Sequence, residues 1–131
     1  MKLLLDTHIW LWSLSERSRL RHHILREIGH VQNELWLSPL SVWEFLMLCR
    51  KRRLAPAEGP QEWLAKAMAR APMRDAPLTF EVAVESEQFQ LPHADSVDRF
   101  LVATARILDL TLITGDRNLI EAKKCQIMAN K

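Results

Sequence analysis

The chain begins with Lys2-Leu3-Leu4-Leu5-Asp6, in which three leucines are followed at once by a carboxylate. A short apolar run that ends on a polar residue is typical of a buried strand in a parallel sheet. The early carboxylate also leads us to expect no secretory signal peptide. Similar short runs recur, and we predict strands at Lys2–Leu5, Leu35–Leu37, Leu78, Thr111–Thr114 and Gln126–Met128.

Helical patterns separate these runs. Ser38-Pro39 has the form of an N-cap followed by a proline at the first helical position, and Gly59-Pro60 opens a second helix. We predict loops at Leu54–Pro60 and Pro72–Pro77, and helices over Leu20–Ile28, Leu40–Cys49, 60–71, Phe80–Phe89 and Phe100–Leu108. Strands that alternate with helices predict an α/β fold with a mainly parallel sheet covered on both faces.

Length and composition indicate one ordinary globular domain over residues 1–131. Hydrophobic residues make up 48% of the 131 residues and charged residues 26%. No apolar run approaches the roughly 20 residues of a membrane helix. Cys49 and Cys125 lack metal-ligand spacing, so we expect reduced thiols and a cytoplasmic location. The net charge of +2 is too small to indicate nucleic-acid binding by itself.

Carboxylates follow two predicted strands and open a predicted buried helix. Asp6 and Asp116 come after strands, Asp95 and Asp98 precede Phe100–Leu108, and Glu44 lies within an apolar helical run. Since the carboxyl ends of parallel strands meet at one edge of a sheet, where ligands bind, we expect these side chains to converge there.

Each carboxylate also has a purely structural interpretation. Asp6, Asp95 and Asp116 fit helix N-caps, and Asp95 with Asp98 resembles a capping box. Glu44 could pair with an arginine or extend to solvent. Together, however, like charges at one edge repel and need a counter-charge. An all-oxygen ligand set favours Mg²⁺ or Mn²⁺, and such a site suits hydrolysis of a phosphodiester.

Four segments that carry these acids resemble the signatures of PIN-domain ribonucleases, most closely the VapC toxins of bacterial toxin–antitoxin pairs. The resemblance covers residue 3 to about residue 120. The segments are Leu4-Leu5-Asp6-Thr7-His8, Ser41-Val42-Trp43-Glu44, His93-Ala94-Asp95-Ser96-Val97-Asp98-Arg99-Phe100-Leu101 and Leu112-Ile113-Thr114-Gly115-Asp116.

The resemblance implies a three-layer α/β/α sandwich and a Mg²⁺- or Mn²⁺-dependent endoribonuclease. Its catalytic, metal-binding acids map onto Asp6, Glu44, Asp98 and Asp116. We expect Thr7, Asp95 and Thr114 to support these ligands. The chain departs from the pattern at Ser96-Val97, where this branch commonly has Pro-Phe, at Gly115 and at Arg117-Asn118. These departures change the loop geometry but remove no ligand.

The resemblance further implies a cognate antitoxin, an RNA substrate and a homodimer. The basic run Arg50, Lys51, Arg52 and Arg53 fits either a solvated helix end or an RNA-binding patch, as does the arginine-rich segment 17–26. Trp10 and Trp12 cannot share one helical face, so one of them is expected in the core, and either is a candidate partner contact. We expect core positions for Trp36, Trp43 and Trp63.

Two other functions remain open from the sequence. One is a non-catalytic RNA- or protein-binding module that keeps the fold. The other is a Mg²⁺-dependent phosphatase-like α/β domain, although Asp6-Thr7-His8 lacks the second acid of an Asp-x-Asp nucleophile motif.

Overall fold

The computed structural model describes residues 1–131, and all of its strands belong to one parallel sheet. The strand order is β3-β2-β1-β4-β5. The strands are β1 (Lys2–Leu5), β2 (Glu34–Leu37), β3 (Arg74–Asp75), β4 (Thr111–Thr114) and β5 (Ile127–Ala129).

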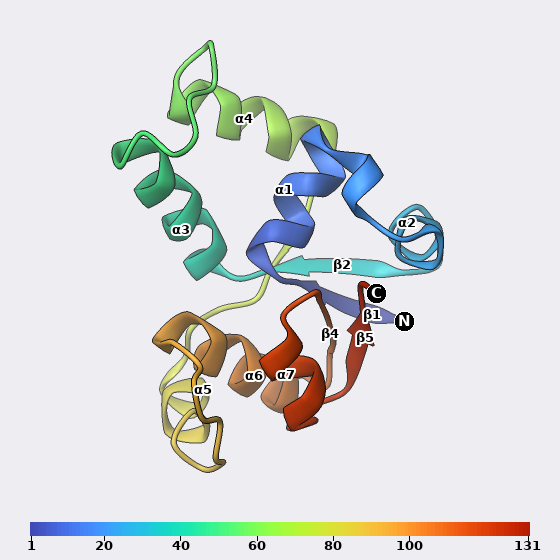
Figure 1. Cartoon of the computed structure of the whole chain (residues 1–131), viewed down its shortest axis with the longest axis vertical. Coiled ribbons are helices and arrows are strands. Elements are labelled where there is room, and N and C mark those ends of the chain that lie inside the picture. Colours follow the sequence, from blue (N-terminus) through green and yellow to red (C-terminus); the bar gives the residue numbers. More distant parts are fainter.

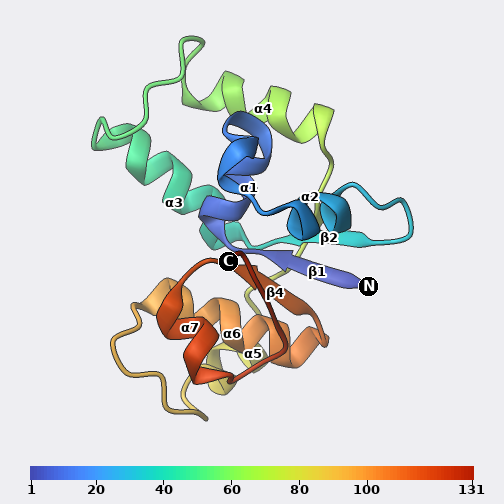
Figure 2. The same ribbon diagram turned by 45° about the vertical axis from the view of Figure 1, so that its right-hand side comes forward.

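Helices cover both faces of this sheet, as Figure 1 shows. One face carries α1 (Thr7–Ser15), the 3-10 turn η1 (Arg17–Arg19), α2 (His22–Ile28), α3 (Pro39–Arg50) and α4 (Pro60–Arg70). The other face carries α5 (Phe80–Glu85), α6 (Ser96–Leu108) and α7 (Arg117–Ala122). The same two groups of helices stay on opposite sides of the strands in Figure 2. The predicted three-layer α/β/α sandwich is therefore confirmed.

The strand order explains why the helices divide in this way. The chain passes from β1 to β2 to β3 in one direction across the sheet, and then returns to β4 and β5 on the other side of β1. Since crossovers between parallel strands are right-handed, reversing direction moves the helices to the opposite face. The direction reverses between β1 and β4, and ligands bind at such a point in open α/β sheets.

The alternation of side chains along β1 divides the core between the two faces. Leu3 and Leu5 pack with Trp10 and Phe45 under α1 and α3, whereas Leu4 packs with the residues of α5 to α7. All three leucines are fully buried. This alternation accounts for the continuous apolar run, because both faces of β1 need an apolar side chain.

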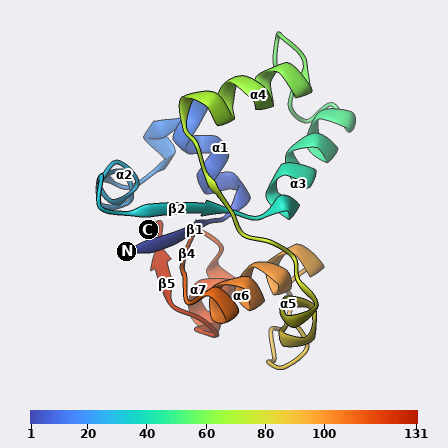
Figure 3. The same cartoon turned by 180° about the vertical axis from the view of Figure 1, so that it is seen from behind.

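The predicted strand at Leu78 is wrong. The third strand is Arg74–Asp75, within the segment expected to be a loop, and Leu78 is exposed between Pro77 and the N-cap Thr79 of α5. Figure 3 shows this yellow-green segment passing from α4 to α5 along the edge of the sheet. A two-residue edge strand with exposed polar side chains leaves no apolar pattern in the sequence.

Several helix boundaries also differ from the prediction. The helix α5 ends at Glu85 rather than Phe89, and α6 begins at Ser96, four residues before the apolar run. No helix was predicted over Thr7–Ser15, yet α1 forms there and buries residues on several sides, including Thr7, Ile9, Trp10, Leu11 and Ser13. A helix buried in this way lacks the one-sided stripe that identifies an amphipathic helix.

The tryptophans are distributed differently from expectation. Trp43 is 50% exposed and is therefore not a core residue. Trp10 is fully buried, with its ring against Phe45 and Trp63 at centroid distances of 6.1 Å. A residue with no exposed surface cannot anchor a partner, so Trp10 is excluded as an interface residue. Trp12 is partly buried, as expected for the second member of the pair.

Candidate active site

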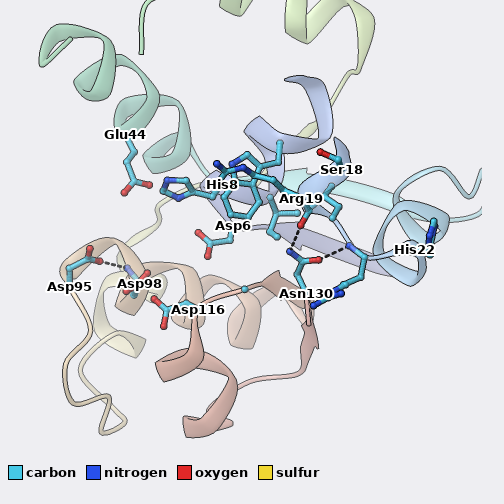
Figure 4. Close-up of a pocket in the computed structure, with 15 residues that line it drawn as sticks. Asp6, His8, Ser18, Arg19, His22, Glu44, Asp95, Asp98, Asp116 and Asn130 are labelled. Carbon is cyan, nitrogen blue, oxygen red and sulfur yellow. Dashed lines mark hydrogen bonds between the residues drawn. The ribbon is translucent and has the colours of Figure 1, made fainter. Parts of the chain in front are cut away.

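A pocket of about 970 Å³ opens at the carboxyl edge of the sheet, beside the point where the strand order reverses. It is lined by all five carboxylates singled out in the sequence: Asp6, Glu44, Asp95, Asp98 and Asp116. Figure 4 shows these side chains arranged around one space, with Glu44 on α3, Asp95 and Asp98 at the start of α6, and Asp116 ahead of α7. The predicted convergence of the acids is present in the structure.

Asp6 lies at the centre of this edge, at the junction of β1 and α1. Its Oδ1 accepts a hydrogen bond from the backbone N–H of Thr7 at 2.7 Å, and its Oδ2 accepts one from the Thr114 hydroxyl at 2.7 Å. Its own backbone N–H donates to the carbonyl of Ile113 at 3.0 Å. Asp6 is thus both a helix N-cap and a carboxylate held in one orientation.

Asp116 and Asp95 combine the same two roles. Asp116 Oδ1 accepts from the N–H groups of Asn118 and Leu119, which caps α7. Asp95 Oδ1 accepts from the N–H of Asp98 at 2.9 Å, which caps α6. The cap and pocket interpretations therefore hold together, since one carboxylate oxygen can cap a helix while the other remains available.

Glu44 differs from Asp6, Asp95 and Asp116 because its carboxylate caps no helix, and like them it takes part in no ion pair. Its side chain is partly exposed and points from α3 into the pocket (Figure 4). The apolar neighbours in the sequence suggested a more buried position. The helix instead turns its Trp43–Glu44 surface outward and buries Ser41 and Phe45. Of the two structural alternatives for Glu44, the arginine partner is not found, and the partly exposed side chain fits the extension toward solvent.

The acids perturb one another's ionisation. Burial raises the pKa of the Asp6 carboxyl, and hydrogen bonds from Thr114 and Thr7 and the nearby His8 offset part of that increase. Burial, and then the negative charges of Asp95, Asp6 and Asp116, raise the pKa of Asp98 to about 7. Asp98 is therefore half-protonated near neutral pH, because burial and three neighbouring carboxylates all disfavour its charged form.

The donor chemistry of the pocket suits a hard divalent cation, because Asp6, Asp98, Asp116 and Glu44 offer carboxylate oxygens only. As the side chains stand, however, no group of three or more His, Cys, Asp or Glu is arranged so that it could hold a metal ion. Asp6 is fixed by two hydrogen bonds, so a shared ion requires the other carboxylates to turn toward it.

Thr114 and Thr7 connect the acids to the framework. The Thr114 hydroxyl donates to Asp6 and accepts from the N–H of Asp116 at 3.0 Å, so it joins two of the four acids. The Thr7 hydroxyl donates to the hydroxyl of Ser41 at 2.9 Å, which ties the start of α1 to the helix that carries Glu44. The sequence predicted no role for Ser41, which appeared only as the first residue of the signature that ends at Glu44, since a serine in a helix gives no signal of such a contact.

The wall opposite the acids is basic. Arg19, Arg21 and His22 line the pocket there, together with Asn130 near the C-terminus. The Arg17–Arg26 segment thus reaches the site, whereas Arg50, Lys51, Arg52 and Arg53 are exposed at the far end of α3 and line no part of this pocket. Nothing in the sequence pointed to Asn130.

No match was found among curated proteins. Three solved structures share the fold: VapBC2 from Rickettsia felis, bound to a DNA fragment from their promoter, DNA-bound VapBC from Salmonella typhimurium, and FitAcB from Neisseria gonorrhoeae. The two VapBC structures match with TM-scores of 0.73 at 14% identity, covering 100% of this chain and 100% and 99% of theirs. FitAcB matches with a TM-score of 0.63 at 19% identity, covering 98% of this chain and 97% of its own.

At these identities the structural likeness establishes the fold alone. The sequence itself matches the model of the PIN domain over residues 3–124. This match includes all five pocket acids, all three layers of the sandwich and the strands on either side of the point of reversal. The chain therefore belongs to the PIN domain family.

Proposed function

We propose that the chain is a Mg²⁺- or Mn²⁺-dependent endoribonuclease and acts as the toxin of a toxin–antitoxin pair. One observation carries the proposal: Asp6, Glu44, Asp98 and Asp116, from four separate segments of a PIN domain, line one pocket with a basic opposite wall. Carboxylates gathered in this way repel one another, which is costly for a purely structural purpose. The cost is explained if the site binds a cation and a phosphodiester.

Asp6, Asp98, Asp116 and Glu44 would hold the divalent ion, which when bound activates water for attack and offsets charge that develops on the phosphate. The Thr114 hydroxyl keeps the Asp6 carboxylate turned into the pocket. Glu44 completes the ligand set or orients the attacking water, because its carboxylate faces the pocket without an ion-pair partner. Asp95 contributes negative charge beside Asp98 and caps α6.

The proposed partners are a cognate antitoxin, RNA and a second copy of the chain, in the cytoplasm. The antitoxin is supported by structures of the same fold, among them a toxin–antitoxin complex from Klebsiella pneumoniae and VapBC-5 from Mycobacterium tuberculosis, a member of the VapBC family of toxin–antitoxin systems. Trp12 remains a candidate partner contact because it is partly exposed at the pocket. No helix has the length and apolar character needed to cross a membrane. Arg50, Lys51, Arg52 and Arg53 remain candidates for contact with RNA outside the pocket.

The test is cleavage of total cellular RNA with Mg²⁺ or Mn²⁺. We expect discrete fragments that disappear with EDTA and with Asp6→Asn. Asp75→Asn is the matched control, because Asp75 is an exposed aspartate on β3 outside the pocket. Cleavage that persists in EDTA would contradict metal dependence. Binding of RNA without any cleavage would favour the non-catalytic module, and release of phosphate from a small phosphomonoester would favour the phosphatase-like alternative.

A further inference from the structure

Two arginines on the basic wall flank a buried leucine. Arg19 ends η1, and Leu20 and Arg21 continue in extended backbone, with φ/ψ of −98°/136° and −66°/154°. Leu20 is 5% exposed and packs in the core with Ile9 and Ile24. Since side chains alternate along extended backbone, burying Leu20 turns Arg21 outward, and Arg19, at the end of η1, is also exposed. Arg19 and Arg21 consequently both line the pocket.

The side chain of Asn130 holds the backbone on both sides of Leu20. Its Oδ1 accepts from the N–H of Arg21 at 2.8 Å, and its Nδ2 donates to the carbonyl of Arg19 at 3.1 Å. Figure 4 shows both bonds reaching from Asn130 to the basic wall. One primary amide thus pairs with this segment as a neighbouring strand would, although the segment is not part of the sheet.

Asn130 is also fixed to the acidic wall. Its backbone N–H donates to the carbonyl of Thr114 at 2.8 Å, and the hydroxyl of that same Thr114 donates to Asp6. The neighbouring Ala129 carbonyl lies 2.9 Å from Nε2 of His23 on α2. Asn130 is therefore the link that sets the position of the two arginines relative to Asp6 and Asp116.

The two arginines differ in how their charge is used within the chain. The Arg19 guanidinium lies over the Trp12 ring, 5.1 Å from its centroid, and its Nε is 2.5 Å from a Glu16 carboxylate oxygen. Arg21 is exposed and takes part in none of the ion pairs. Arg21 is therefore the cation on this wall that is free to bind an anion.

We infer that Arg19 and Arg21, held in place by Asn130, form the backbone-phosphate-binding wall of the pocket. The inference rests on the proposed function and names the part of the site that receives the RNA strand. A phosphodiester that approaches five carboxylates is repelled unless positive charge faces them. Arginine suits this purpose because its guanidinium pairs with two phosphate oxygens at once. Asn130 is a positioning residue, which acts through the two arginines.

The experiment measures binding of a fluorescein-labelled single-stranded RNA by anisotropy across a series of salt concentrations. Ca²⁺ replaces Mg²⁺, and a gel confirms that the RNA stays intact. We expect Arg21→Gln to weaken binding about threefold to tenfold at low salt and to reduce the slope of log affinity against log salt by about 0.7, the value for one lost phosphate contact on a single strand. The matched control is Arg26→Gln, since Arg26 is an exposed arginine on α2 outside the pocket.

Asn130→Leu tests the positioning role, because leucine has a similar shape but makes neither hydrogen bond. We expect Asn130→Leu to bind RNA more weakly and with a smaller slope of log affinity against log salt. We also expect Arg21→Gln to weaken RNA binding by a smaller factor in the Asn130→Leu background than in the wild type. A purely structural role would lower the melting temperature without this coupling. Asn130→Ala provides a second variant if the leucine disturbs folding.

The outcomes separate this inference from the proposed function. A wild-type chain that binds and cleaves RNA, with Arg21→Gln indistinguishable from Arg26→Gln, would overturn the phosphate-binding wall and leave the nuclease intact. Independent effects of Arg21→Gln and Asn130→Leu would overturn the positioning role alone. A wild-type chain that neither binds nor cleaves RNA would overturn both proposals.

Discussion

The hydroxyl of Thr114 donates a hydrogen bond of 2.7 Å to Oδ2 of Asp6, joining the ends of two neighbouring strands whose residues are 108 positions apart in the chain. The same oxygen accepts the N–H of Asp116. Thr114 is fully buried, so no water replaces either contact if the hydroxyl is lost. A single side chain thus sets the orientation of one acid and the backbone of another.

Thr114→Val should reduce RNA cleavage about tenfold or more while the fold is retained. We expect a stability loss of about 1–3 kcal/mol, because the N–H of Asp116 and one oxygen of Asp6 lose their partner. The bond from Thr114 lowers the pKa of Asp6, so its loss should move the acidic limb of the pH–rate profile to higher pH. Urea denaturation and cleavage rates across pH measure these effects. Thr114→Ser should recover most activity, and equal activity of the valine and serine variants would contradict the role of the hydroxyl.

Asp98 should make the metal-free protein less stable as the pH rises. Its pKa is raised to about 7 in the folded chain, against about 3.9 when unfolded. Between these values the folded state binds more protons than the unfolded state, so the free energy of unfolding falls as the pH increases from about 4 to about 7. We expect a fall on the order of 1–2 kcal/mol, because Asp98 is partly exposed and solvent screens its interactions.

Urea denaturation in EDTA at several pH values measures this dependence. Asp98→Asn should flatten it, whereas Asp75→Asn, at an exposed position outside the pocket, should leave it unchanged. A wild-type curve that is flat or rises between pH 4 and 7 would contradict the raised pKa.

Mg²⁺ or Mn²⁺ should raise the melting temperature, since a ligand that binds only the folded state stabilises it. Saturation at about 100 times the dissociation constant corresponds to about 2.7 kcal/mol. Asp6→Asn and Asp116→Asn should each reduce the shift, and Asp75→Asn should preserve it. A thermal melt in millimolar metal against EDTA measures the effect, and an unchanged melting temperature would argue against the cation site.

Trp10→Ala should destabilise the fold by about 3–5 kcal/mol, because it removes a buried aromatic side chain. Trp10 is fully buried and meets Phe45 and Trp63, which themselves stack at 4.6 Å. Trp43→Ala is the control, because Trp43 is half exposed and its removal should lower the free energy of unfolding much less. Chemical denaturation compares the two variants, and similar losses for both would contradict the assignment of Trp10 to the core.

The local character of the acids explains why so much of the site was predictable. Asp6 and Asp116 follow apolar strands, and Asp95 opens a buried helix, so each position depends on a few neighbouring residues. The same locality made the helix caps predictable. Given a parallel sheet, these positions meet at one edge without further information.

The errors lie where burial depends on distant segments. Trp43 belongs to an apolar run, yet it remains half exposed. The two-residue strand β3 exists only because β2 presents an edge to pair with. Helix α1 is recognisable only when both its neighbours and the sheet are in place, because it is buried on several sides.

The sequence by itself determined the strands that end on carboxylates, the N-cap positions of Asp6, Asp95 and Asp116, and the convergence of the acids at one edge, because each of these rests on short-range patterns. Only the tertiary structure decided which side chains complete the site. Asn130 meets Arg19 and Arg21 across 111 and 109 positions of the chain, and Thr114 meets Asp6 across 108. Such pairings arise from the order of the strands in the sheet, and no local pattern encodes them.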